Sequence, residues 1–299
     1  MHVVPVPTSF DDRALDGFAA GFTEWPPAER VLLDARATTW ASPYGLTALL
    51  TAGQALVEQG ASKPRLAAPD AEDTRFYWAR AGFFHHAVEY FDLIGKIPKR
   101  GIDTPGDLLV PVTAIRRAED VIGVVDRVQE GATRILTTEL GLEAKVALGF
   151  AMALSESCQN IVEHAGTGGW VAAQTYHWRR RLGRKVVVIA VSDAGVGFRR
   201  SLEATEAKKV GDRWGDGAAL ESALLHAVSR FRETGRGQGL AGIKRYLLRW
   251  RGKISIRSGT ARVSVLPEWD DDVPVAEHLR FFPGSQVQII IPAQEGEAR

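Results

Sequence analysis

The sequence predicts an α/β protein with two domains, a smaller α/β domain followed by a larger α+β sandwich. Its 299 residues are enough for roughly two domains, and a hydrophobic fraction of 45% can build two cores. Strand-like and helix-like segments alternate between residues 30 and 84, and residues 186–191 form an unbroken β-branched run that is typical of a buried strand.

The first domain is predicted to span residues 1–98. Residues 30–34 and 65–69 have the pattern of short buried strands, and residues 44–59 have a broad apolar face at helical spacing. Residues 73–81 form a second predicted helix that ends at Gly82. This alternation of strands and helices indicates one α/β layer.

A linker is predicted at residues 99–110, where Pro, Gly and charged residues gather. We expect the second domain to cover residues 111–293 and a short tail to follow at 294–299. A helix is predicted over residues 113–137 at the start of this second domain.

The next segment places four polar residues on one stripe of an apolar helix. At about 100° per residue, Glu156, Asn160, Glu163 and His164 share one face. The opposite face would enter a core, and its residues are Ala147, Ala151, Leu154, Cys158, Ile161 and Val162. This pattern fits either a ligand-binding helix or an ordinary surface helix.

A strand at residues 185–191 is predicted to pair with residues 170–178 through a turn that holds three arginines. The strand leads into Asp193, Gly195 and Gly197, where glycine permits a sharp turn and a close approach to a ligand. The Asp193 carboxylate could accept a hydrogen bond from an amino group there.

A second glycine-rich loop at residues 234–240 precedes a predicted helix at 241–250. Free N–H groups at a helix N-terminus suit an anion such as phosphate.

Together these motifs resemble the GHKL (histidine-kinase-like, Bergerat-fold) ATPase family. The N box resembles Glu156-x-x-x-Asn160, the G1 box Asp193-x-Gly195-x-Gly197, and the G2 box Gly235-x-Gly237-x-Gly239-Leu240. A final strand at residues 283–292 resembles the family's closing strand, with Ser285 in place of Thr. The resemblance implies a mixed sheet that helices cover on one face.

The resemblance also implies a role for each site residue with ATP and Mg²⁺ as the ligands. Asp193 would accept from the adenine amino group, Asn160 would bind Mg²⁺, and Glu156 would act as the catalytic base. The remaining cofactor-binding residues, around the nucleotide and its phosphates, are Gly195, Gly197, Arg236, Gly237, Gly239 and Leu240. Residues 199–233 resemble the ATP lid, within which residues 218–228 have helical spacing.

The first domain resembles a STAS domain, the fold of anti-sigma-factor antagonists, through its strand and helix pattern around Gly45 and Leu46. Pro43 and Tyr44 stand where that family carries a phosphorylatable serine. Ser42 is better explained as a helix N-cap. The domain is therefore expected to dock or sense without that phosphorylation switch.

The composition excludes several classes. A net charge of +1 gives no electrostatic reason to bind nucleic acid, and one cysteine cannot form an internal disulfide. No apolar run is long enough to span a membrane, which favours a cytoplasmic protein without membrane attachment.

The favoured function is a cytoplasmic Mg·ATP-binding regulatory protein that switches protein–protein interactions. It would be an ATPase or an anti-sigma-type protein serine kinase, and its ligands would be ATP or ADP and a regulatory protein, with a homodimer left open. The alternative is a nucleotide-dependent interaction module without phosphoryl transfer. A sensor histidine kinase is disfavoured because residues 113–137 contain no histidine.

Overall fold

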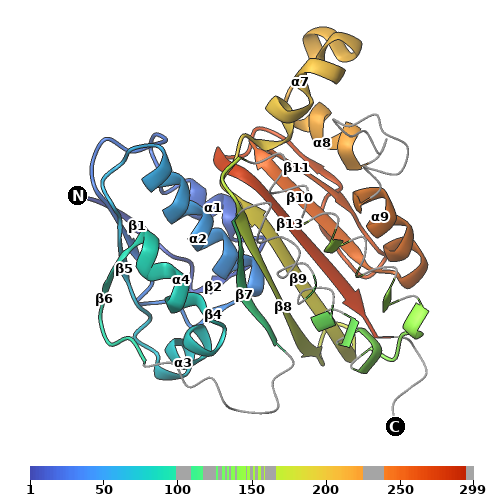
Figure 1. Ribbon diagram of the computed structural model, residues 1–299, viewed down its shortest axis with the longest axis horizontal. Helices are drawn as coiled ribbons and strands as arrows, with labels where there is room; N and C mark the ends of the chain where they lie inside the picture. Colours follow the sequence, from blue (N-terminus) through green and yellow to red (C-terminus); the bar gives the residue numbers. More distant parts are fainter. Residues whose placement is uncertain are drawn as a thin grey trace.

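The computed structural model describes residues 1–98, 109–116, 166–224 and 239–293, and scattered positions between 126 and 158. Of residues 109, 239–242 and 245 it describes only the backbone. The chain forms two packed units, one built on a four-stranded sheet and one on a seven-stranded sheet (Figure 1).

The N-terminal unit has a parallel sheet of order β1-β3-β5-β6. Its strands are β1 (His2–Pro5), β3 (Val31–Asp34), β5 (Arg65–Ala67) and β6 (Asp92–Ile94). A short parallel pair adds β2 (Ser9–Phe10) and β4 (Trp40–Ala41). The helices are α1 (Leu15–Ala19), α2 (Pro43–Glu58), α3 (Glu72–Arg80) and α4 (Phe83–Tyr90). This is the α/β layer that the sequence predicted.

The local signals of this unit act as expected. Ser42 is the N-cap of α2, since its side chain accepts a hydrogen bond from the Gly45 N–H at 3.2 Å. Gly82 has φ +78°, a left-handed conformation that favours glycine, and it separates α3 from α4.

The C-terminal unit has a sheet of order β12-β11-β10-β13-β9-β8-β7. Its strands are β7 (Leu109–Ile115), β8 (Gly169–Trp178), β9 (Arg184–Asp193), β10 (Lys253–Gly259), β11 (Ala261–Val265), β12 (Val275–Ala276) and β13 (Phe282–Pro292). Its continuous helices are α7 (Gly197–Val210), the 3₁₀ turn η1 (Gly211–Arg213), α8 (Asp216–Leu224) and α9 (Gly239–Trp250). The fold class predicted from the sequence is therefore confirmed.

The sheet was predicted to be mixed, but every pairing between its described strands is antiparallel. β9 and β10 run in the same direction, as expected for strands joined through helices. However, β13 lies between them and pairs antiparallel with both.

The structure also corrects the start of this unit. Residues 109 and 110, predicted as linker, and residues 113–115, predicted as helix, all belong to β7 at the edge of the sheet. Pro111 lies at a register shift between Val110 and Thr113, and an edge strand tolerates a residue without an N–H at such an irregularity. Helix is found further along, at described positions between 126 and 138.

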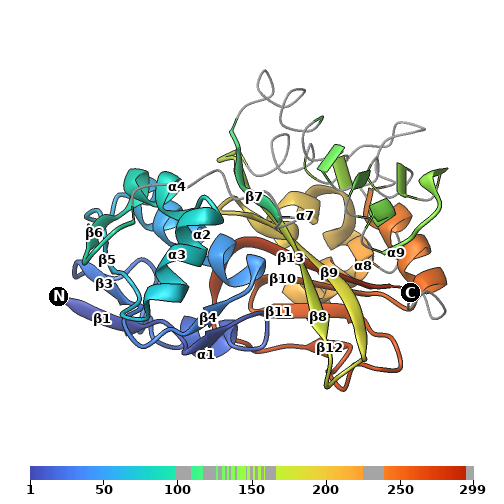
Figure 2. The same ribbon diagram turned by 90° about the horizontal axis from the view of Figure 1, so that it is seen from below.

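The two faces of the seven-stranded sheet have different covers (Figures 1 and 2). Helices α8 and α9 lie on one face, over a core that includes Ile189, Ile256 and Ile289. The N-terminal unit lies on the other face, where α2 packs on β8, β9 and β13. Fourteen of the sixteen residues of α2 are buried, so this helix is enclosed between the two units.

Polar groups join the two units in buried positions. The Thr51 hydroxyl donates to Ser192 Oγ at 3.0 Å, and Gln54 accepts from Trp170 Nε1 at 2.9 Å and donates to the Thr167 carbonyl at 2.7 Å.

Further along the same face, Lys253 Nζ lies 3.2 Å from Asp12, 3.3 Å from Asp270 and 3.1 Å from Asp272. We call these four residues the Lys253 cluster. Because Lys253 is 1% exposed, the cluster holds its charges away from water.

Candidate nucleotide-binding site

The site is built at the end of β9, a central strand that pairs with β8 on one side and β13 on the other. Side chains along a strand point alternately to the two faces of the sheet. The hydrogen bond from Thr51 shows that Ser192 faces the N-terminal unit. Asp193, the next residue, therefore faces the side that the helices cover. Its cross-strand neighbours are Gly169 in β8 and Ser285 in β13.

Asp193 is a buried carboxylate that neutral donors surround. Its Oδ1 accepts from the Gly195 N–H at 2.9 Å, and the backbone and side chain of Ser285 also hydrogen-bond it. Burial raises the pKa of Asp193 to about 7, against these hydrogen bonds, which lower it. A carboxylate held in this way can accept from an amino group of a ligand.

The turn after Asp193 depends on two glycines with positive φ. Gly197 has φ +72° and begins α7, and a Cβ there would lie 2.6 Å from Ser258 Oγ. Gly284 has φ +67°, and a Cβ there would overlap the Asp193 carbonyl oxygen. Gly195 has no positive φ, so it contributes its N–H to the turn and not its conformational freedom.

Ser258 is a residue of this turn that the sequence did not single out. Its hydroxyl oxygen accepts from the Phe198 N–H at 3.1 Å, and the hydroxyl donates to the Gly284 carbonyl at 2.9 Å. It therefore ties the first turn of α7 to the start of β13. No sequence signal marks it, because its partners are 60 and 26 positions away.

The helix with the polar stripe is described only in part. Ala147, Ala151, Leu154 and Cys158 are buried in the core beneath the sheet, so the predicted apolar face is confirmed at those positions. Burial raises the pKa of the Cys158 thiol to about 12, which suits a core residue and not a reactive one. Glu156, Asn160, Glu163 and His164 lie outside the described residues.

Only the end of the second glycine-rich loop lies among the described residues. Gly235, Arg236 and Gly237 lie outside the described residues, whereas Gly239 and Leu240 are the first two residues of α9. The chain reverses at Arg251 and Gly252, so α9 and β10 run in opposite directions. The N-terminus of α9, with its free N–H groups, therefore points toward the end of the sheet that carries Asp193 (Figure 1).

The described part of the predicted lid is ordered as α7, η1 and α8. Asp216 fixes the start of α8, since its Oδ2 accepts from the N–H of Thr260 at 2.8 Å and from its hydroxyl at 2.7 Å. Leu220 and Leu224 are buried, which confirms the predicted helical spacing to residue 224. α7 extends beyond the end of the sheet (Figure 1).

The described residues thus place a buried acceptor and a glycine turn at one end of the sheet, and the N-terminus of α9 points toward that end. The described residues contain no group of three or more His, Cys, Asp or Glu side chains that could hold a metal ion. Within the same residues, no helix has the length and apolarity needed to cross a membrane.

These features define a nucleotide-binding class of α/β sandwich, with an acidic residue and glycine turns at the sheet end. Residues 145–294 match the model of the histidine kinase-, DNA gyrase B-, and HSP90-like ATPase family. The chain belongs to this family, which implies nucleotide binding by an ATPase-type or kinase-type domain. A comparison with curated proteins gives no match.

Proposed function

We propose that the protein is a cytoplasmic Mg·ATP-binding regulator that changes its affinity for a protein partner with its nucleotide state. The observation that carries this proposal is the position of Asp193, a buried carboxylate at the end of a central strand. It accepts hydrogen bonds from the Gly195 N–H and from Ser285. A carboxylate favours adenine, which offers an amino group where guanine offers a carbonyl.

The remaining roles follow the family motifs and are part of the proposal. Asn160 binds Mg²⁺, and Glu156 activates the attacking water or hydroxyl. Arg236, Gly237, Gly239 and Leu240 surround the phosphates at the start of α9. The orientation of α9 supports this arrangement, since its N-terminus points toward the Asp193 end.

We further propose that residues 1–98 are a STAS-like module and that the described part of the lid helps to display the nucleotide state. Four parallel strands connected through helices support the first assignment. The N-terminal module already covers one sheet face, so a protein partner, including a second copy of the chain, would bind elsewhere. α7 is a suitable reporter because it begins at Gly197, directly after the Asp193 turn.

Two substitutions test the site. Asp193→Ala is expected to abolish binding of ADP and ATP, whereas Glu156→Ala is expected to keep binding and remove turnover. Glu72→Ala and Asp73→Ala are matched controls, because both carboxylates are exposed and lie in α3 of the N-terminal unit, outside the proposed site and the lid. Calorimetry with Mg²⁺ measures binding, and normal affinity in the Asp193 variant would exclude the proposed adenine contact.

The chemistry that follows binding is tested with γ-labelled ATP. Labelled free phosphate identifies an ATPase, and label on a protein serine identifies a kinase of the anti-sigma type. Neither product, with binding intact, identifies a nucleotide-dependent interaction module, the second candidate. Glu156 favours the first two outcomes, since binding alone requires no base.

A further inference from the structure

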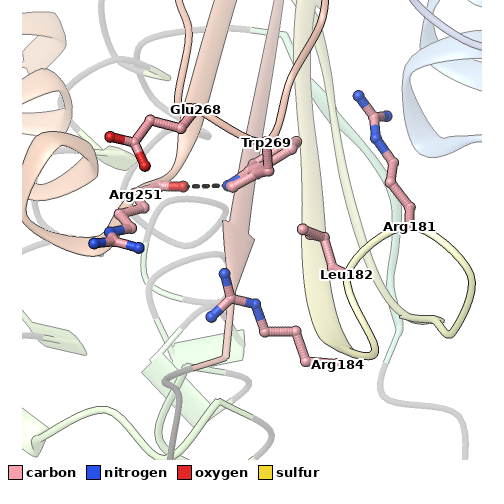
Figure 3. A pocket seen from close by; sticks show the side chains of 6 residues that line it. All are labelled: Arg181, Leu182, Arg184, Arg251, Glu268 and Trp269. Carbon is pink, nitrogen blue, oxygen red and sulfur yellow. Dashed lines mark hydrogen bonds between the residues drawn. The ribbon is translucent and has the colours of Figure 1, made fainter.

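A cavity of about 270 Å³ lies at the opposite end of β9 from Asp193 (Figure 3). Arg184 at its rim and Asp193 are the first and last residues of the same ten-residue strand, so about 30 Å separates the two places. The cavity is lined by Arg181, Leu182, Arg184, Arg251, Glu268 and Trp269. Nothing in the proposed nucleotide site uses these residues.

The lining carries three arginines against one glutamate. Arg181 is engaged with acids beside the cavity, 3.2 Å from Asp270 and 3.6 Å from Asp271. Arg184 is oriented by donating to the Ala293 carbonyl at 3.2 Å. In Figure 3, Arg184 and Arg251 extend on the same side of Trp269, and Arg181 points away from them.

Trp269 forms a fixed aromatic wall. Its Nε1–H donates to the Arg251 carbonyl at 2.7 Å, and its ring meets Trp178 edge to face at a centroid distance of 6.0 Å. The Arg181 guanidinium lies 5.4 Å from the ring centroid. Because three contacts hold the ring in place, a ligand that packs on it restricts the Trp269 side chain little further.

The backbone of Arg251 fixes where its carbonyl and its side chain lie. Gly252 N–H bonds the Leu247 carbonyl at 2.9 Å, which closes α9 with Arg251 at the left-handed position that usually carries glycine. Arg251 has φ +50°, a conformation that L residues adopt at a cost. The Arg251 carbonyl thus accepts from Trp269, and the Arg251 side chain lines the cavity.

We propose that this cavity binds a small molecule in which an anionic group is attached to a flat ring. Arg184 and Arg251 bind the anion, a phosphate or a carboxylate, because guanidinium groups match both geometries. Trp269 and Leu182 contact the ring. Glu268 at the rim disfavours ligands with a second negative charge.

The test uses the full chain with saturating MgADP, so that the proposed nucleotide site is occupied. Phenyl phosphate and benzoate are titrated while the indole N–H signals are followed by NMR, and Trp269→Phe identifies the Trp269 signal. That signal is expected to shift to saturation with at least one of the two anions. The stronger of the two identifies the preferred anion, and neutral phenol is expected to cause no shift.

Matched variants separate the site from general charge. Arg251→Asn removes the guanidinium but keeps a residue that tolerates the left-handed backbone, and it is expected to weaken binding about tenfold. Arg184→Gln is expected to act similarly. Arg249→Asn, two residues away and outside the cavity, is expected to stay within twofold.

Three results would overturn the proposal. They are no shift of the Trp269 signal with either anion, equal affinity in Arg251→Asn and Arg249→Asn, or loss of probe binding when MgADP is added. The last result would place the probe in the nucleotide site. Failure of nucleotide binding itself would leave the cavity test intact, because the same titration works without MgADP.

Discussion

The two faces of the seven-stranded sheet solve the same burial problem differently. The helix-covered face is apolar along its strands, as Ile254 and Ile256 in β10 show. On the opposite face the alternate residues of the same strand are Lys253, Ser255 and Arg257, and all three are buried. The Ser264 hydroxyl donates to Ser255 Oγ at 2.8 Å, and the Arg257 guanidinium forms an ion pair with Asp16 at 3.0 Å.

This difference indicates what each face does. An apolar face supplies stabilisation without directional preference, which suits the adjustment of these helices that the proposed function requires. Buried ionic and hydrogen-bonded groups add little net stability, but any arrangement that separates them from their partners has a much higher free energy. The buried polar groups of this second face, which we call the polar face, therefore fix one position of the N-terminal module on the sheet, beside the apolar contacts of Trp170 and Phe282.

Lys253→Met gives the strongest test of this contrast. It breaks the ion pair of the buried Asp12, whereas Asp270 and Asp272 keep arginine partners, and we expect the free energy of unfolding to fall by about 3–5 kcal/mol. Ile254→Val, one residue on and facing the helices, is expected to cost about 1 kcal/mol. Urea unfolding measures both. Equal losses would mean that water reaches the Lys253 cluster and that the two faces do not differ in this way.

Asp193 provides the next test, because it is a buried acid on the helix side whose partners are neutral donors. Its pKa in the folded state is about 7, against an ordinary value of 3.8. Between these values the folded protein holds a proton that the unfolded chain has lost, so stability falls as pH rises from about 4 to about 7. The change is of the order of 4 kcal/mol.

Asp193→Asn should remove this dependence, and the unfolding free energies of the two proteins measured from pH 4 to pH 8 should converge toward acid pH. Parallel curves would show that Asp193 does not titrate in this window. Nucleotide binding gives a second measurement. If adenine requires the carboxylate, ADP should bind about tenfold more weakly at pH 6 than at pH 8.

Gln54 tests the hydrogen-bonded part of the polar face. Gln54→Leu leaves the Trp170 Nε1–H and the Thr167 carbonyl without this partner, and the expected loss is about 2 kcal/mol. Trp170→Phe removes one of those groups. The double variant should therefore lose less than the sum of the single variants. Strict additivity would show that this contact does not couple the two units.

The sequence predicted the parts of the fold that local patterns encode. The run of β-branched residues predicted β9, helical spacing predicted α2 and α9, and the turn after β9 pointed to Asp193. The edge strand β7 was missed because Pro111 and a short, irregular pattern resemble a loop, while its pairing partner lies some sixty residues away.

The polar face was also beyond local patterns. Thr51 and Gln54 lie off the apolar face predicted for α2, but the second unit buries them. Ser258 and Gly284 complete the Asp193 turn only because β10 and β13 are brought to the same end of the sheet. Such residues depend on which elements pack together, and periodicity along one element carries no information about that.

The smallest expected effect concerns the N-cap of α2, the helix that covers the polar face. Ser42→Ala removes the acceptor for the Gly45 N–H and is expected to cost about 1 kcal/mol in urea unfolding. Ser42→Asp makes the test specific. Aspartate is as good a cap as serine at an exposed helix end, but Ser42 is 2% exposed and its hydroxyl also donates to the Phe10 carbonyl at 3.3 Å. A carboxylate would be desolvated and would face that carbonyl, so the aspartate variant should be less stable than the alanine variant. An aspartate variant as stable as the wild type would mean that water reaches this end of α2.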